Sequence, residues 1–454
     1  MRVALVQALD SPDRDVPSVQ ADVTHDTPTR LQRYSMPAGE MGSAGGQTLI
    51  AALLPILLAP HAPATFLIGA VIATEGLFAL VLPYVAGAAT DSLGARIQGR
   101  LGRRGLLLAL AAPPMALALV LMPFRDSFWT LAGTAVVYFA ALHLYATPLR
   151  ALLIESTPEH RWGAVQGVLG AMHLGGVAFG LIAGGLLFSI WEPLPFLVGA
   201  GLIAATTAIT LVAARHGGDT ERGAEDAEDA EDCGQGDGQA WRMRDELRFW
   251  RDLLRDREAR RFLAGNILWN AGTEGIRPYI FLFATVVLGV AIQTASLALL
   301  GFLGAAGVGS LLVGHYGDRF GRRRLLLIGA VVTGLAMMPG MFVRDLLPLI
   351  LLLLPAGLGA AALVSLPYPV FEEIVNEEDV GRSTGTFFAS VGIARLVAPL
   401  LVGAAIDGAR AWLPNGDGYP IMWPVAGTLI LMGALMLWLA GKAGRGRRHR
   451  RQAL

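Results

Sequence analysis

The sequence predicts an all-α membrane protein with twelve transmembrane helices in two pseudo-symmetric six-helix halves. Three observations predict this fold: an apolar composition, apolar runs of bilayer-spanning length, and a motif present in both halves. Of the 454 residues, 54% are hydrophobic and 16% are charged, whereas about 25% of the residues of a soluble protein are charged. The composition therefore excludes an ordinary soluble domain.

Twelve apolar runs follow one another along the chain, each near the roughly 20 residues that span a bilayer core. We expect spans at 43–60, 64–87, 105–123, 128–153, 163–190, 194–214, 262–289, 293–315, 324–343, 346–370, 384–406 and 420–441. They divide the chain into an N-terminal tail (1–38), an N-terminal half (39–214), a central loop (215–261), a C-terminal half (262–441) and a basic C-terminal tail (442–454).

Basic residues predict the orientation of the chain. The two tails and the even-numbered connections hold 30 of the 36 Lys and Arg residues, and the odd-numbered connections hold three. Lys and Arg are enriched in the cytoplasmic loops of membrane proteins. We therefore expect a multi-pass protein of the cytoplasmic (inner) membrane with both tails in the cytoplasm.

The central loop has two parts. Residues 219–237 are acidic and rich in glycine, a composition typical of a disordered, solvated segment. After them, Met243, Leu247, Trp250 and Leu254 recur at helical spacing between arginines. This pattern predicts an amphipathic helix on the inner membrane surface, with a site for a regulatory partner as the alternative.

A short motif follows the second span and the eighth. The first copy consists of Gly87, Asp91 and, after an insertion, Gly102, Arg103 and Arg104; the second consists of Gly314, Asp318, Arg319, Gly321, Arg322 and Arg323. Asp318 lies 227 residues after Asp91, and a second pair of glycine motifs, at 163–167 and 381–385, has an offset of 218 residues. An offset near half the chain indicates duplication, and duplicated halves of membrane helices are typical of secondary transporters.

The residue types of the motif suggest a cytoplasmic gate. A carboxylate near a helix C-terminus is unfavourable unless a cation pairs with it, and the arginines of the motif supply that cation. We interpret the motif as a latch that opens and closes as the halves rock. The alternative is that the arginines only signal orientation.

At these residues the chain resembles the major facilitator superfamily, whose Gly-x-x-x-Asp-Arg-x-Gly-Arg-Arg motif occupies the turns between helices 2 and 3 and helices 8 and 9. The resemblance implies transport by alternating access. A finer resemblance, to the sucrose–proton and glycoside–cation symporters, rests on the residues at 101–104, 148–155 and 365–368. It implies proton-coupled uptake of a sugar-like solute, although the acidic residue of that family is missing from 139–144.

An opposing resemblance lies in the fifth span. The glycines at 176, 180, 184 and 185 are similar to the antiporter motif of drug exporters. The same spacing is also ordinary helix packing. Proton-driven efflux of a drug or metabolite therefore stays open as the alternative function.

Two carboxylates inside spans are candidates for proton coupling. Glu75 lies in the middle of the second span among apolar residues, and Glu274 lies near the middle of the seventh. A charge at the bilayer centre is costly, so such residues need a function or a partner. Burial disfavours the charged form of a carboxylate, which suits Glu75 as the proton carrier. Glu274 is the second candidate, with Arg277 one turn beyond it to keep it ionised.

Polar residues at helical spacing predict the solute cavity. They share one face of the fourth or the seventh span: His143, Thr147 and Arg150 in the former, and Asn266, Asn270 and Arg277 in the latter. Alternatively, the polar residues of the seventh span link helices to one another. Arg150 alternatively extends toward the cytoplasmic surface.

Other classes of function lack their motifs. The chain has no Gly-x-x-x-x-Gly-Lys-Ser/Thr phosphate loop and no His-Glu-x-x-His zinc motif, and its one cysteine, Cys233, permits no disulfide framework. The formal net charge of zero gives no indication of nucleic acid. We expect no catalytic residues, cofactor or metal. The expected partners are a small solute, a proton or other cation, and lipid, for a monomer; a membrane sensor or enzyme is a remoter alternative.

Overall fold

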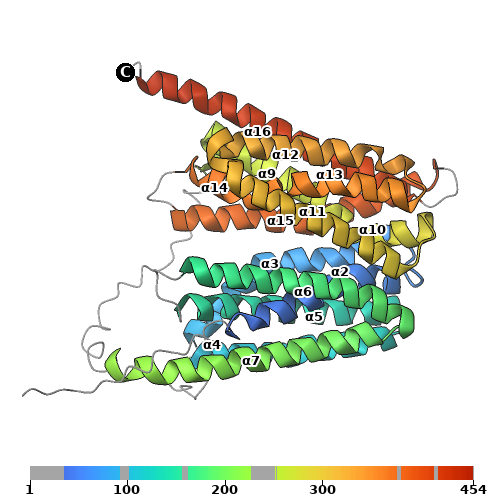
Figure 1. The fold of residues 1–454 in the computed structure, drawn as a ribbon, viewed down its shortest axis with the longest axis vertical. Helices are drawn as coiled ribbons and strands as arrows, with labels where there is room; N and C mark the ends of the chain where they lie inside the picture. The colour runs from blue at the N-terminus through green and yellow to red at the C-terminus, as the bar shows by residue number, and fades with distance from the viewer. Residues whose placement is uncertain are drawn as a thin grey trace, which may run out of the picture.

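The computed structural model consists of two helical bundles that lie side by side, one from each half of the chain (Figure 1). No strand occurs in the part of the chain that it describes. The structure describes residues 35–92, 102–155, 162–225, 251, 253–375, 380–413 and 418–452. Residues 219–225, the first part of the segment predicted to be disordered, are helical in the structure, so the prediction was wrong there. Residues 226–237 and most of the predicted amphipathic helix of the central loop lie outside the described residues.

The N-terminal bundle contains six long helices. They are α2 (Ala38–Leu58), α3 (Thr65–Ser92), α4 (Gly102–Leu121), α5 (Phe128–Glu155), α6 (Trp162–Ile190) and α7 (Leu194–Glu225). Each contains a stretch long and apolar enough to cross a membrane. All six coincide with predicted spans, although α3, α5 and α7 run past the predicted ends at 87, 153 and 214.

The C-terminal bundle contains both long and short helices. They are α9 (Arg257–Ile276), α10 (Ile280–Leu282), the π-helical turn η4 (Phe283–Val287), α11 (Ile292–Phe320), α12 (Arg322–Met337), α13 (Leu346–Ser365), α14 (Pro367–Glu372), α15 (Val380–Ala409) and α16 (Met422–Gln452). Together with the N-terminal bundle, the described residues hold eleven segments long and apolar enough to cross a membrane.

Two predicted spans are broken by proline. The expected span at 262–289 is divided into α9, a turn, α10 and η4, and the one at 346–370 is divided after Ser365. Proline lacks a backbone N–H, and its ring clashes with the carbonyl group of the preceding helical turn. Pro278 and Pro367 stand directly after the turn residue Arg277 and the cap residue Leu366. In these two places the structure has shorter helical segments in succession, where the sequence predicted one span.

The two halves meet along two pairs of helices. Helix α3 packs against α15, and α6 packs against α11 (Figure 1). The first contact brings two backbones together, because a side chain on Gly76 would overlap the backbone nitrogen of Leu396, and one on Gly69 would overlap the carbonyl oxygen of Pro399. Glycine is required where helices approach this closely. The α3–α15 contact lies beside the candidate site.

Candidate functional site

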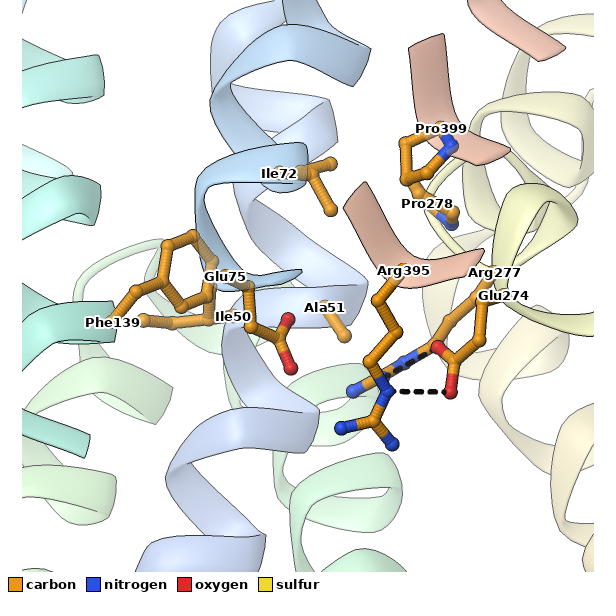
Figure 2. A pocket seen from close by; sticks show the side chains of 10 residues that line it. All are labelled: Ile50, Ala51, Ile72, Glu75, Phe139, Glu274, Arg277, Pro278, Arg395 and Pro399. Carbon is orange, nitrogen blue, oxygen red and sulfur yellow. Dashed lines mark hydrogen bonds and ion pairs between the residues drawn. The ribbon is translucent and has the colours of Figure 1, made fainter. Parts of the chain in front are cut away.

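A cavity with an empty volume of about 390 Å³ lies between the halves. Helices α2, α3 and α5 supply its N-terminal wall, and α9, the turn after it and α15 supply the opposite wall (Figure 2). The residues that line it are Ile50, Ala51, Ile72, Glu75, Phe139, Glu274, Arg277, Pro278, Arg395 and Pro399. A mostly apolar cavity with a few converging charged groups is typical of a small-molecule site.

The C-terminal wall carries a carboxylate bound by two arginines. Nη1 of Arg277 donates to Oε2 of Glu274 at 3.2 Å, and Nε of Arg395 donates to Oε1 at 3.0 Å. The first pair is formed within α9 and its end at i, i+3 spacing, and the second joins α9 to α15. Both oxygens of Glu274 are therefore held by cations, which favours its ionised form.

The N-terminal wall carries a carboxylate with a neutral partner. Glu75 on α3 is only 6% exposed, and Nε2 of Gln47 on α2 donates to its Oε1 at 2.6 Å. No arginine or histidine of the described residues forms an ion pair with it. Its carboxylate points across the cavity toward the two guanidinium groups (Figure 2). Glu75 is therefore a buried acid that forms no direct ion pair among the described residues.

Of the two predicted asparagines on α9, Asn266 links this helix to α15 and Asn270 bonds to Asn266 within α9. Asn266 is fully buried, and its Nδ2 donates to the hydroxyl oxygen of Ser390 on α15 at 2.7 Å. Nδ2 of Asn270 donates to the carbonyl and side-chain oxygens of Asn266, at 2.8 and 3.0 Å. Neither asparagine lines the cavity described above. Their role toward a solute stays a prediction.

The predicted residues of α5 lie along that helix beside the cavity. His143 is half-buried, with its Nε2 buried and without a hydrogen-bond partner. The hydroxyl of Thr147 donates to the His143 carbonyl at 3.2 Å, and Arg150 is exposed. None of the three lines the cavity in this conformation. They too remain candidates by prediction.

The motif residues lie at the end of the molecule where α11 turns into α12, which we call the motif end. Gly321 forms this turn with φ of +84°, a conformation that favours glycine. Nη1 of Arg323 donates to Oε1 of Glu258 at 2.7 Å, and Arg322 lies 3.5 Å from Glu373. Of the remaining motif residues, Gly314 and Arg319 are exposed, Gly87 lies in α3, and Gly102 and Arg104 lie in the first turn of α4. The side chains of Asp91, Arg103 and Asp318 lie outside the described residues.

The halves are fastened together at the opposite end. Both oxygens of Asp407, near the end of α15, accept hydrogen bonds from the first residues of α3: from the N–H of Thr65 at 2.9 Å and of Phe66 at 2.7 Å. Arg410 lies 3.4 Å from Asp407, and its Nη2 donates to the Thr65 hydroxyl at 2.7 Å. The first N–H groups of a helix have no intrahelical partner and attract a carboxylate. We call these four residues the Asp407 latch.

Sequence reasoning gave little weight to three residues of these sites: Gln47, Arg395 and Asp407. Arg395 had the clearest signal, because an arginine inside an apolar span needs a partner. Gln47 was a lone amide in the first span. Asp407 gives the least signal, because its partners in the other half are backbone N–H groups that no side-chain pattern reveals.

Comparison with known proteins agrees with this arrangement. The family model of the Major Facilitator Superfamily matches residues 38–307 and 275–453. A multi-drug resistance efflux pump PmrA homolog of Lactococcus lactis subsp. lactis (strain IL1403) is 24% identical over 344 residues, which are 73% of this chain and 78% of that protein. The inner membrane metabolite transport protein YdjE of Escherichia coli (strain K12) is 30% identical over 142 residues, only 30% of each chain.

Solved structures share the fold at low sequence identity. The nucleoside transporter NupG superposes with a TM-score of 0.69 and 14% identity, covering 91% of this chain and 98% of that one. A bacterial homolog of the human lysosomal transporter Spinster, in an inward-facing and occupied conformation, gives 0.67 and 13%, covering 90% and 96%. The resemblance noted in the repeated motif is thus confirmed at the level of the family, and the chain belongs to the major facilitator superfamily of membrane transporters.

Proposed function

We propose that this transporter moves a small solute across the cytoplasmic membrane by alternating access, driven by protons. The observation that carries the proposal is the cavity between the halves, into which a buried carboxylate without an adjacent cation projects. Alternating access requires a central site and two ends that open in turn. The Asp407 latch closes one of those ends.

The packing of α6 against α11 supports an opening at the motif end. Near the latch, a side chain on Gly185 of α6 would meet the Ser296 side chain of α11. Toward the motif end, Gly167 and Gly170 of α6 and Gly304 of α11 have nothing within 4 Å of a built Cβ position. With the tails in the cytoplasm, as the basic residues predict, the motif end is the cytoplasmic end and this conformation is inward-facing.

We infer that Glu75 carries the proton and that Glu274 stays ionised between its arginines. We further infer that α9, α10 and η4 together make the twelfth crossing, which completes two six-helix halves of a monomer.

In the outward-facing state, Asp91 and Asp318 pair with arginines of the motif. Asp318→Asn then slows transport while expression is retained; wild-type flux in both Asp→Asn variants would remove this gate.

Two solute classes follow from the sequence and the relatives. Uptake of a sugar-like solute rests on the resemblance to the sucrose–proton symporters, and the guanidinium groups of the cavity suit a hydroxyl-rich solute. Efflux is the second candidate, favoured by the relative named as a multi-drug resistance pump, which matches 73% of this chain.

Uptake by liposomes that contain only this protein tests the proposal. Vesicles with an alkaline interior are incubated in a metabolite extract, and the solutes that enter are identified by mass spectrometry. We expect at least one solute to accumulate with wild type and none with Glu75→Gln. Vesicles with an acidic interior, incubated in the same extract, test the efflux candidate, because the outward flow of protons drives the solute of an antiporter into the vesicle. If neither gradient moves any solute, the proposed function is wrong.

A further inference from the structure

We propose that the cavity binds the carboxylate of a small organic anion on the guanidinium groups of Arg395 and Arg277. The inference rests on the proposed transport function and adds the charge of the solute. It starts from hydrogen-bond donors that the protein leaves unused inside the cavity.

The two arginines use few of their N–H groups on the protein. Arg395 donates to Glu274 through Nε, and Arg277 donates through Nη1. Within the described part of the chain, the hydrogen bonds of the two arginines give no protein acceptor for Nη1 and Nη2 of Arg395 or for Nε and Nη2 of Arg277. None of these four atoms is among the buried polar atoms without a partner. Figure 2 shows the two terminal nitrogens of Arg395 on the side of the guanidinium that no dashed line reaches.

These donors have the geometry that carboxylates require. A guanidinium presents two parallel N–H groups, which match the two oxygens of a carboxylate. The Arg277 and Arg395 side chains are 34% and 33% exposed, so a solute in the cavity can reach them. The orientation of Arg395 is fixed by its bond to Glu274, which reduces the entropy lost on binding.

The rest of the cavity suits an apolar body. Ile50, Ile72 and Phe139 line the N-terminal wall, and Pro278 and Pro399 line the other. The space between the two walls is narrow in this conformation, which limits the site to a small solute. The solute class is therefore a small carboxylate with an apolar or aromatic body.

The charges of the cavity connect the anion with the proton. Arg277 and Arg395 balance Glu274 and an ionised Glu75, so the empty cavity is neutral. A proton on Glu75 leaves one net positive charge, and one carboxylate restores neutrality, which a site inside the membrane favours. The other groups facing Glu75 are Gln47, which is neutral, and Tyr138 and His143 of α5, which lie within electrostatic range. Anion and proton therefore enter together.

A cationic solute fits the same atoms less well. Both oxygens of Glu274 already accept hydrogen bonds. Glu75 is 6% exposed, and one of its oxygens is held by Gln47. The groups that a solute can reach most easily are donors. Binding of a lipophilic cation at Glu75 would contradict the inference.

Three probes that differ in charge but share a phenyl ring and chain length test the inference. Phenylacetate, phenylacetamide and 2-phenylethylamine are titrated into the purified wild-type protein at about pH 6, where the acid is ionised and the amine is protonated. We expect phenylacetate to bind at least ~10-fold more tightly than the other two, as a charged, bidentate hydrogen bond predicts. Equal binding of the three, or tighter binding of the amine, overturns the inference.

Variants locate the anion. Arg395→Lys keeps the charge and its bond to Glu274 but lacks the fork, and we expect it to lose about 10-fold in phenylacetate affinity. Arg395→Gln should lose more. Arg344→Gln is the matched control, because Arg344 donates only to carbonyls of its own loop. Unchanged affinity in a folded Arg395→Lys protein places the anion elsewhere and contradicts the inference.

The extract experiment separates this inference from the proposed function. If wild type accumulates carboxylic acids, both stand. If it accumulates only neutral or cationic solutes, transport stands and the anion site is wrong. If the wild-type protein moves no solute, the proposed function is wrong. The titration with phenylacetate still tests the anion site in that case.

Discussion

Two buried carboxylates face the same cavity from opposite halves, and they differ in their partners. Glu274 is held by Arg277 and Arg395 at 3.2 and 3.0 Å, whereas Glu75 is held only by the amide of Gln47 at 2.6 Å. Both are largely enclosed by protein. The comparison indicates that the hydrogen-bond partner of a carboxylate, more than its burial, determines whether the carboxylate stays ionised or can bind a proton. The arginines hold Glu274 in the wall of the cavity, whereas Glu75 has a neutral partner, which is why we propose Glu75 as the proton carrier.

The largest expected effect is on proton-driven accumulation. Glu75→Gln removes the one carboxylate of the cavity that lacks a cation, so the pH gradient no longer drives uptake. We expect complete loss of accumulation but retained solute exchange, both measured in liposomes. Glu192→Gln, in the exposed connection between α6 and α7, is the control. Accumulation by Glu75→Gln with unchanged pH dependence would make Glu75 structural and Glu274 the carrier.

Removing the other carboxylate should damage the fold rather than the coupling alone. Glu274→Gln leaves two arginines facing each other without their shared anion. We expect a loss of about 1.5–3 kcal/mol in the free energy of unfolding, visible as a lower melting temperature of the purified protein. The double variant Glu274→Gln with Arg395→Gln should recover part of the loss. Wild-type stability of the single variant would show that the cluster is no structural element.

A change at the latch should shift the balance between conformations. Asp407→Asn weakens the cap on α3 and should destabilise the closed latch by about 1 kcal/mol, which is roughly a fivefold change in population. Spin labels at the exposed positions His61 and Trp412, in a background without Cys233, report the separation of the halves at this end. Asp345→Asn at the start of α13, where the side chain makes no capping bond, should leave the distances unchanged. The latch idea fails if both variants behave alike.

The smallest effect should follow from removal of the neutral partner. Gln47→Leu deletes one hydrogen bond to Glu75, at a cost of about 0.5–1.5 kcal/mol in stability. We expect proton-driven accumulation to persist at a reduced rate, measured beside Glu75→Gln. If Gln47→Leu abolishes accumulation as completely as Glu75→Gln does, the amide itself takes part in coupling. The neutral partner of Glu75 would then be more than the absence of a cation.

The sequence by itself determined the elements that depend on local pattern. Apolar runs of membrane length predicted the helices, apart from the breaks at Pro278 and Pro367, and the repeated motif predicted the two halves and the family. The position of Glu75 among apolar residues and the i, i+3 spacing of Glu274 and Arg277 were also readable, because both depend only on the helical period.

The tertiary structure alone decided which groups meet across helices. Arg395 reaches Glu274 over 121 residues, and Asp407 caps α3 over 342 residues. Asn266, which the sequence suggested for the cavity, bonds Ser390 on α15 instead. The physical reason is that helical period fixes which residues share a face, but the rotation of each helix, set by contacts such as Gly76 on Leu396, fixes what that face meets.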